Sequence, residues 1–248
     1  MFEQIKRHPI QIAAHFDFSL VLTYSVESRA VLPLLPPGLT PDEKDGQAFL
    51  AVAMVQTRKL RPAFLPAWTG KDFFLTGYRI FTRMKTAEGR NLRGLRILRS
   101  DADRPSMVFF GNMLTHYNYH RVIVDCDRQE RLLNVKVRSD SGQTDLSVQA
   151  RIVDRPLLPL NSPFKTWREA RMFAGPLPFT FDYESATDSI VIIEGKRENW
   201  NPLPVEVSVA YAKFFDGVFP NETPRLASAF LVENVPYTWK AGVLEKPA

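Results

Sequence analysis

Short apolar runs alternate with turn-forming residues along most of the chain, which is the pattern of a protein rich in β-strands. The first two runs are FSLVLTYSV at 18–26 and AFLAVAMVQ at 48–56. The second is apolar at nearly every position, which indicates a strand buried on both faces. The same pattern predicts further strands at 73–84, 90–99, 107–110, 119–125, 132–138, 145–153, 179–183, 189–194 and 205–215.

Only two segments have the pattern of helices, 27–35 and 163–173. The first must end at Pro36-Pro37, because proline disfavours the helical conformation of the residue before it. Many short strands with turns between them are typical of an antiparallel sheet or barrel. We therefore predict an α+β protein, mainly β, with one or two short helices, organised as a single domain over residues 1–248. Hairpin turns are predicted at 85–89 and 139–144.

The amino-acid composition indicates the size of the core and the cellular compartment of the protein. The chain has 248 residues, of which 45% are hydrophobic, enough to bury a large core. Cys126 is the only cysteine, so no internal disulfide can form, as is usual for reducing compartments. No apolar run approaches the roughly 18 residues of a membrane span, and the first 15 residues lack the pattern of a secretion signal. We predict a soluble, cytoplasmic protein with no membrane partner.

The net charge of +5 raises the question of nucleic acid, because phosphate binding needs clustered Lys and Arg. The densest cluster is RNLRGLRILR at 90–99. This segment is predicted as a strand, on which Arg93 and Arg99 face one way and Arg96 the other. No single basic stripe forms, so we predict no nucleic-acid partner.

The segment FFGNMLTHYNYHR at 109–121 holds most of the candidate chemistry. Polar and titratable side chains between two apolar runs are typical of a pocket lining. His116 and His120 are four residues apart, a spacing that on a helix could place two imidazoles on one metal ion. Two ligands are too few, however, and a passage from loop to strand would separate them. We predict no metal and no cofactor.

Several motifs, in their order along the chain, resemble the acetoacetate decarboxylase superfamily, and more closely an uncharacterised bacterial branch of it. The opening YSVESRAV at 24–31 followed by LLPPGL at 34–39 resembles the strand, short helix and proline elbow of that superfamily. The similarity spans nearly the whole chain. It continues through GQAF at 46–49, Tyr78-Arg79, the hairpin at 89–103, YNYH at 117–120, WRE at 167–169 and WNPL at 200–203.

The resemblance implies a largely antiparallel β-barrel with flanking strands, enclosing a pocket for a small carboxylate-bearing substrate. It also implies a departure in chemistry. The paired lysines of the decarboxylases, one of which forms an imine with the substrate, align with Tyr119 and His120, and Asn118 aligns with a proline. Ser25 stands where the decarboxylases carry an arginine. We therefore predict that the chain is not a Schiff-base decarboxylase.

Two hypotheses use this pocket. In the first, it binds a small carboxylate-bearing or partly apolar ligand without reaction, and the ligand-binding residues are Arg79, Phe110, His116, Tyr117 and Asn118. In the second, the protein is an enzyme for a small keto or hydroxy acid, with His120 and Tyr119 as catalytic residues. His120 would act as general acid or base, Tyr119 or Tyr117 would bind an enolate oxygen, and Arg79 would hold the carboxylate.

A third hypothesis is an interaction module, with a homo-oligomer built through exposed strand edges. The proline-rich loops predicted at 61–70 and 201–204 would be further contact surfaces.

Overall fold

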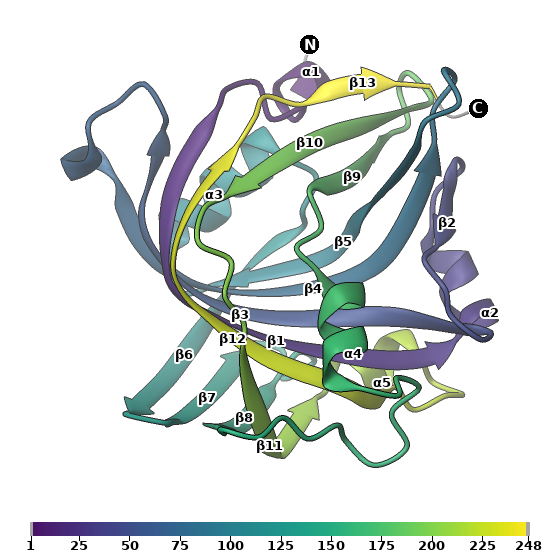
Figure 1. Ribbon diagram of the computed structural model, residues 1–248. Helices are drawn as coiled ribbons and strands as arrows, with labels where there is room; N and C mark the ends of the chain where they lie inside the picture. Colours follow the sequence, from purple (N-terminus) through teal and green to yellow (C-terminus); the bar gives the residue numbers. More distant parts are fainter. Residues whose placement is uncertain (1, 247–248) are drawn as a thin grey trace.

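The computed structural model describes residues 2–246, most of which belong to one 13-stranded sheet (Figure 1). The strands are β1 (Ile12–Glu27), β2 (Leu39–Pro41), β3 (Gln47–Pro62), β4 (Lys71–Lys85), β5 (Asn91–Ala102), β6 (Tyr119–Gln129), β7 (Leu132–Ser139), β8 (Leu146–Ile152), β9 (Phe179–Glu184), β10 (Ser189–Arg197), β11 (Leu203–Ala212), β12 (Arg225–Trp239) and β13 (Val243–Glu245). The α-helices are short: α1 (Phe2–Ile5), α2 (Ser28–Val31), α3 (Pro105–Leu114), α4 (Trp167–Ala174) and α5 (Phe214–Val218).

The strand pairings trace two rings that share five long strands, β12, β1, β3, β4 and β5. Strands β6, β7, β8 and β11 complete the first ring, and β9 and β10 complete the second. In Figure 1 these two sets of strands lie below and above the shared strands. Most pairings are antiparallel, but β5 runs parallel to both β6 and β9. The sheet therefore curves into rings without being a simple barrel.

Side chains of a strand alternate between its two faces, so each shared strand serves both rings. On β1, Leu20 and Leu22 point into the first ring, whereas Ser19 and Val21 face the second. The interior of the first ring is filled by fully buried apolar side chains. They include Leu50, Val52 and Met54 of β3, Ile80 of β4, Val135 of β7 and Val148 of β8.

The predicted class, α+β and mainly β, is confirmed, and most predicted strands are present. The strand predicted at 107–110 is wrong, because these residues lie inside α3. That helix begins at Pro105, a favourable first position because the missing N–H would have no partner there. The strand predicted at 205–215 ends at Ala212, and Phe214 begins α5.

The helix predicted at 163–173 is α4, which starts later, after Thr166. The hydroxyl oxygen of Thr166 accepts a hydrogen bond from the Glu169 backbone N–H and so caps the helix. Within the described part of the chain, no helix combines the length and the apolar character that a membrane crossing requires.

Candidate functional site

The second ring is hollow. It contains a cavity of about 210 Å³ whose walls come from the inner faces of β1, β3, β4, β5, β10 and β12. Helix α3 and the segment 8–12 form part of its wall, and Ala174 at the end of α4 borders it elsewhere. Most of the lining is apolar and aromatic. The polar side chains on it are His8, Ser19, Thr57, Arg79, Ser100, Thr115, Tyr117, Tyr119, Thr180, Arg197 and Tyr237.

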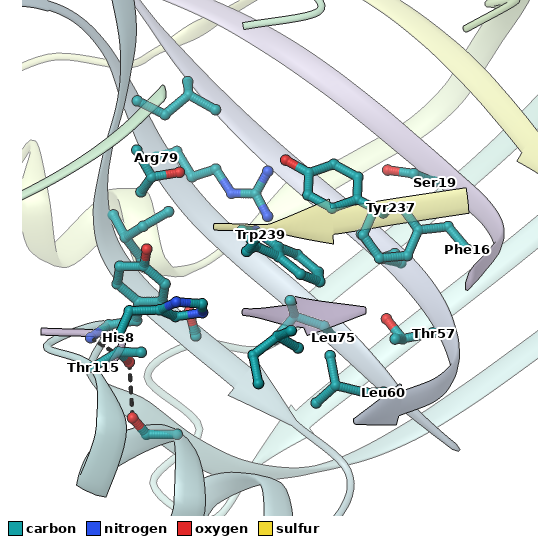
Figure 2. Close-up of a pocket in the computed structure, with 18 of the residues that line it drawn as sticks. His8, Phe16, Ser19, Thr57, Leu60, Leu75, Arg79, Thr115, Tyr237 and Trp239 are labelled. Atoms are coloured by element: carbon teal, nitrogen blue, oxygen red, sulfur yellow. Dashed lines mark hydrogen bonds between the residues drawn. The ribbon is translucent and has the colours of Figure 1, made fainter. Parts of the chain in front are cut away.

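Arg79 on β4 places a guanidinium in this cavity, and Figure 2 shows it directed toward Tyr237. Its Nε is buried and has no hydrogen-bond partner. Burial lowers the pKa of Arg79, an effect that the nearby hydroxyls of Tyr237, Tyr119 and Tyr117 partly oppose. Gly77 provides the space, because a Cβ there would stand 3.0 Å from the Nε of Arg79. Because Gly77 has no side chain, the desolvated guanidinium of Arg79 can lie directly against the backbone of β4.

A second arginine, Arg197 at the end of β10, lines the same cavity. Its Nη2 donates a hydrogen bond to the Tyr237 hydroxyl over 3.0 Å, and its guanidinium lies 4.9 Å from the Tyr237 ring centre and 5.4 Å from that of Trp200. The hydroxyl of Tyr237 comes so close to Gly195 that a Cβ there would be 2.1 Å away. Aromatic faces hold this cation in place without neutralising it.

Among the residues whose burial is described, four carboxylates are buried, and each is paired with at least one arginine. They are those of Asp42, Asp101, Asp182 and Glu184. By contrast, neither Arg79 nor Arg197 forms an ion pair with a carboxylate of the described residues. Because a charge that is partly removed from water and lacks a counter-ion is unfavourable, these two half-buried arginines give the cavity a positive field that an anionic group would neutralise.

Two tyrosines extend the polar wall from the segment that leads into β6. The rings of Tyr117 and Tyr119 have centroids 6.4 Å apart. Burial raises the pKa of Tyr119 to about 12 and that of Tyr117 well above its usual value, so both hydroxyls remain protonated donors at neutral pH. Asn112 of α3 fixes Tyr119 by bonding both its backbone N–H and its carbonyl, each over 2.8 Å.

His8 is the imidazole of this site. The side chain lines the cavity, is only 8% exposed, and has no hydrogen-bond partner at Nδ1. Burial lowers its pKa, while the nearby backbone carbonyl of Lys240 opposes that change. Figure 2 labels His8 among the side chains that line the cavity.

The structure brings together four of the predicted site residues, Arg79, Phe110, Tyr117 and Tyr119, around the cavity. Phe110 of α3 lines the cavity and is also 52% exposed.

The other predicted site residues, His116, Asn118 and His120, are not among those that line the cavity. Because side chains alternate along a strand, Tyr119 faces inward while His120 faces away and contacts Asn118 (Nε2 to Oδ1, 2.9 Å). Burial and the charge of Arg99 lower the pKa of His120. The backbone N–H of His116 donates to Asp182 over 3.1 Å.

Sequence reasoning missed His8, Arg197, Tyr237 and Trp239. The alternation in ENVPYTW at 233–239 is a strand signal that would have predicted the end of β12, and with it the inward direction of Tyr237 and Trp239. Nothing local marks His8 or Arg197, because each joins the site only through pairing across the ring.

The side chains that line the cavity offer few kinds of functional group. None of the described residues that line the cavity is a lysine, an aspartate, a glutamate or a cysteine. Across residues 2–246, no group of three or more His, Cys, Asp or Glu side chains is placed to hold a metal ion. The described lining therefore offers cations, hydroxyl donors and one imidazole.

Several solved structures share this fold. The acetoacetate decarboxylase of Legionella pneumophila subsp. pneumophila str. Philadelphia 1 matches with a TM-score of 0.62 at 11% identity, covering 95% of this chain and 88% of that one. The enduracididine biosynthesis enzyme MppR, complexed with pyruvate, matches with a TM-score of 0.62 at 13% identity, over 95% and 90% of the two chains. An acetoacetate decarboxylase-like enzyme from Sphingomonas wittichii RW1 gives 0.56 at 10% identity, over 98% and 93%.

The protein therefore has the fold of the acetoacetate decarboxylase-like superfamily, as its sequence motifs predicted. The chain belongs to the DUF2071 family, described as an uncharacterized conserved protein, whose model matches residues 14–228. A search of curated proteins finds no match to the sequence.

Proposed function

We propose that the protein binds a small monocarboxylate, of the size and kind of a short 2-oxo acid, in the cavity of the second ring. The observation that carries this proposal is Arg79, a half-buried arginine on the cavity wall whose buried Nε has no hydrogen-bond partner and which has no carboxylate partner among the described residues. A ligand carboxylate would supply the missing partner, and a planar guanidinium fits it with two hydrogen bonds. Arg197 adds a second positive charge on the same cavity.

The remainder of the lining defines the rest of the ligand. Tyr117 and Tyr119 present protonated hydroxyls that can donate to a keto or hydroxy oxygen. Around them, Phe16, Leu75 and Trp239 offer apolar surface to a short carbon chain. The likeness to a solved pyruvate complex of MppR supports a 2-oxo acid as the first ligand to test.

The proposal excludes imine chemistry at this site. Formation of a Schiff base requires a primary amine within reach of the substrate carbonyl, and no lysine of the described residues lines the cavity. We expect borohydride treatment in the presence of acetoacetate or pyruvate to leave the mass of the protein unchanged. A covalent adduct on any lysine would contradict this part of the proposal.

The binding test is calorimetric titration with pyruvate, 2-oxobutyrate and butyrate, alongside the neutral analogues pyruvamide and butyramide. We expect the carboxylates to bind and the amides not to. Arg79→Met should weaken binding by about 30-fold, since loss of a buried ionic hydrogen-bond partner costs about 2 kcal/mol or more.

Arg121→Met is the matched control, because Arg121 is exposed on β6 and lies outside the cavity. It removes the same charge and should leave the affinity unchanged. Equal binding of acids and amides, or equal loss in the two variants, would reject the proposed site.

A further inference from the structure

We propose that His8 is a catalytic base that removes a proton from carbon 3 of a 2-oxo acid in this cavity, so that the protein catalyses enolisation. This inference rests on the proposed function, because it takes the carboxylate of the 2-oxo acid to be held by Arg79. It assigns a reaction to the cavity and a role to a residue outside the segment 109–121.

The backbone holds His8 in place from both sides. The His8 N–H donates to the Leu114 carbonyl at the end of α3 over 3.0 Å, and the His8 carbonyl accepts from the Gly242 N–H over 2.9 Å. The preceding residue, Arg7, forms two hydrogen bonds with the buried carboxylate of Glu184, of 2.6 and 2.7 Å. These bonds hold a short N-terminal strap across one wall of the cavity.

The strap keeps His8 in a conformation that a side chain other than glycine seldom adopts. Its φ is +54°, in the left-handed region. The two backbone hydrogen bonds to Leu114 and Gly242 impose this conformation. Here it directs an imidazole into the cavity wall, where the side chain is 8% exposed and its Nδ1 has no hydrogen-bond partner.

Among the described residues that line the cavity, His8 alone can take up a proton near neutral pH. The lining contains no carboxylate, amine or thiol, its tyrosines have raised pKa values, and its arginines stay protonated. Burial lowers the pKa of His8, so its imidazole is neutral and able to act as a base at pH 7. Among the described residues that line the cavity, His8 is therefore the candidate for proton transfer.

The reaction is internally balanced. The carboxylate is bound by Arg79, and a tyrosine hydroxyl hydrogen-bonds the keto oxygen. The imidazole nitrogen takes a proton from carbon 3, and the electrons of that C–H bond form the carbon–carbon double bond of the enolate, whose charge lies on the keto oxygen beside Arg79 and Arg197. The imidazolium exchanges its proton with solvent and returns one to carbon 3. The net result in D₂O is replacement of hydrogen by deuterium, with no other reactant.

The experiment follows this exchange by proton NMR, as the loss of the pyruvate methyl signal in D₂O at pD 7.4 with full-length protein. We expect the wild-type protein to accelerate the exchange above the buffer rate in proportion to protein concentration. His8→Gly should lower the exchange rate by at least 100-fold, the usual size of a general-base contribution. Glycine accepts a φ of +54°, so this variant preserves the backbone of the strap.

Chemical rescue separates a base from a structural residue. Free imidazole added to His8→Gly should restore a concentration-dependent part of the rate, and should do little to the wild-type protein. His15→Gln, on β1 and outside the cavity lining, is the matched control and should exchange at the wild-type rate. His120→Gln tests the rival assignment, and loss of exchange in that variant with retention in His8→Gly would overturn the role of His8.

Calorimetry with pyruvate distinguishes failure of binding at Arg79 from failure of catalysis by His8. If pyruvate binds in an Arg79-dependent manner but the wild-type protein accelerates no exchange, the catalytic inference fails and the proposed function stands. If pyruvate does not bind, the proposed function fails first. A wild-type rate in His8→Gly, with or without imidazole, rejects the inference even when binding is intact.

Discussion

The two rings of the sheet use the same five strands and have opposite interiors. In the first ring, strands β1 and β3 present Leu20, Leu22 and Met54 to a core in which these side chains are fully buried. In the second ring, the opposite faces of those strands present Ser19 and Thr57 to a cavity. One sheet thus holds a dense apolar core on one side and a charged, hollow site on the other.

This comparison shows how a single strand can be divided between stability and chemistry. Because side chains alternate, the residue that supports the core and the residue that faces the ligand can be neighbours in sequence, as Tyr78 and Arg79 are. Tyr78 is fully buried in the first ring, and burial raises its pKa far above the usual range. Substitutions on the two faces should therefore have separable effects.

The largest expected difference is in the loss of stability when a leucine of the first ring, or one of the second ring, is truncated to alanine. Leu22→Ala removes a fully buried side chain from the first ring and should lower the free energy of unfolding by about 2–5 kcal/mol. Leu75→Ala, on the cavity wall, should cost less than half as much, because that side chain already borders empty space. Urea unfolding of the two variants measures the difference. Equal losses would show that the second ring is as densely packed as the first.

Loss of an arginine should have opposite signs at paired and unpaired positions. Arg93→Met leaves the buried carboxylate of Asp42 with one cation fewer, and should lower the free energy of unfolding by about 3 kcal/mol. Arg79→Met removes a cation without a partner, and should raise it by about 1 kcal/mol in the absence of ligand. Chemical denaturation of both variants without ligand is the measurement. Destabilisation by Arg79→Met would mean that the cation is satisfied in the free protein.

A methyl group behind the guanidinium should disturb ligand binding. In Gly77→Ala, the new Cβ would stand 3.0 Å from Nε and Nη2 of Arg79 and would displace the guanidinium. We expect carboxylate affinity to fall about tenfold, or about 1.4 kcal/mol, when measured by calorimetry. The control is Gly217→Ala, where a Cβ would meet nothing within 4 Å. Unchanged affinity in Gly77→Ala would show that carboxylate binding does not depend on the position of the Arg79 guanidinium.

The smallest expected effect is a pH dependence that originates at His8. Its pKa in the folded protein lies below the ordinary value of 6.5, so the unfolded chain takes up the proton first as pH falls. This contribution lowers stability below about pH 6.5. Asp101 acts in the opposite direction, because burial raises its pKa to about 6 and protonation then favours the folded state. Thermal unfolding of the wild type and His8→Asn between pH 7.5 and 5 isolates the histidine, and parallel curves would contradict its assignment.

The sequence predicts the fold better than the site. Alternation and turn residues predict most strands, and ordered motifs predict the superfamily. The strand predicted at 107–110 is wrong because an apolar stretch of four residues fits a strand or a helix equally well. Within the site, Arg79, Phe110, Tyr117 and Tyr119 were found because they lie in or near recognisable motifs. The direction of His120 was not predictable, since a shift of one residue in the start of β6 reverses which side chains face inward.

The strap at His8 also affects when the cavity can exist. Its two backbone bonds join a residue near the start of the chain to Leu114 and to Gly242, and Trp239 supplies part of the wall. During synthesis on the ribosome, the early strands emerge long before the residues that complete the second ring. We therefore expect the wall of the cavity around Arg79 to be completed only after β12 and the residues that follow it have joined the second ring.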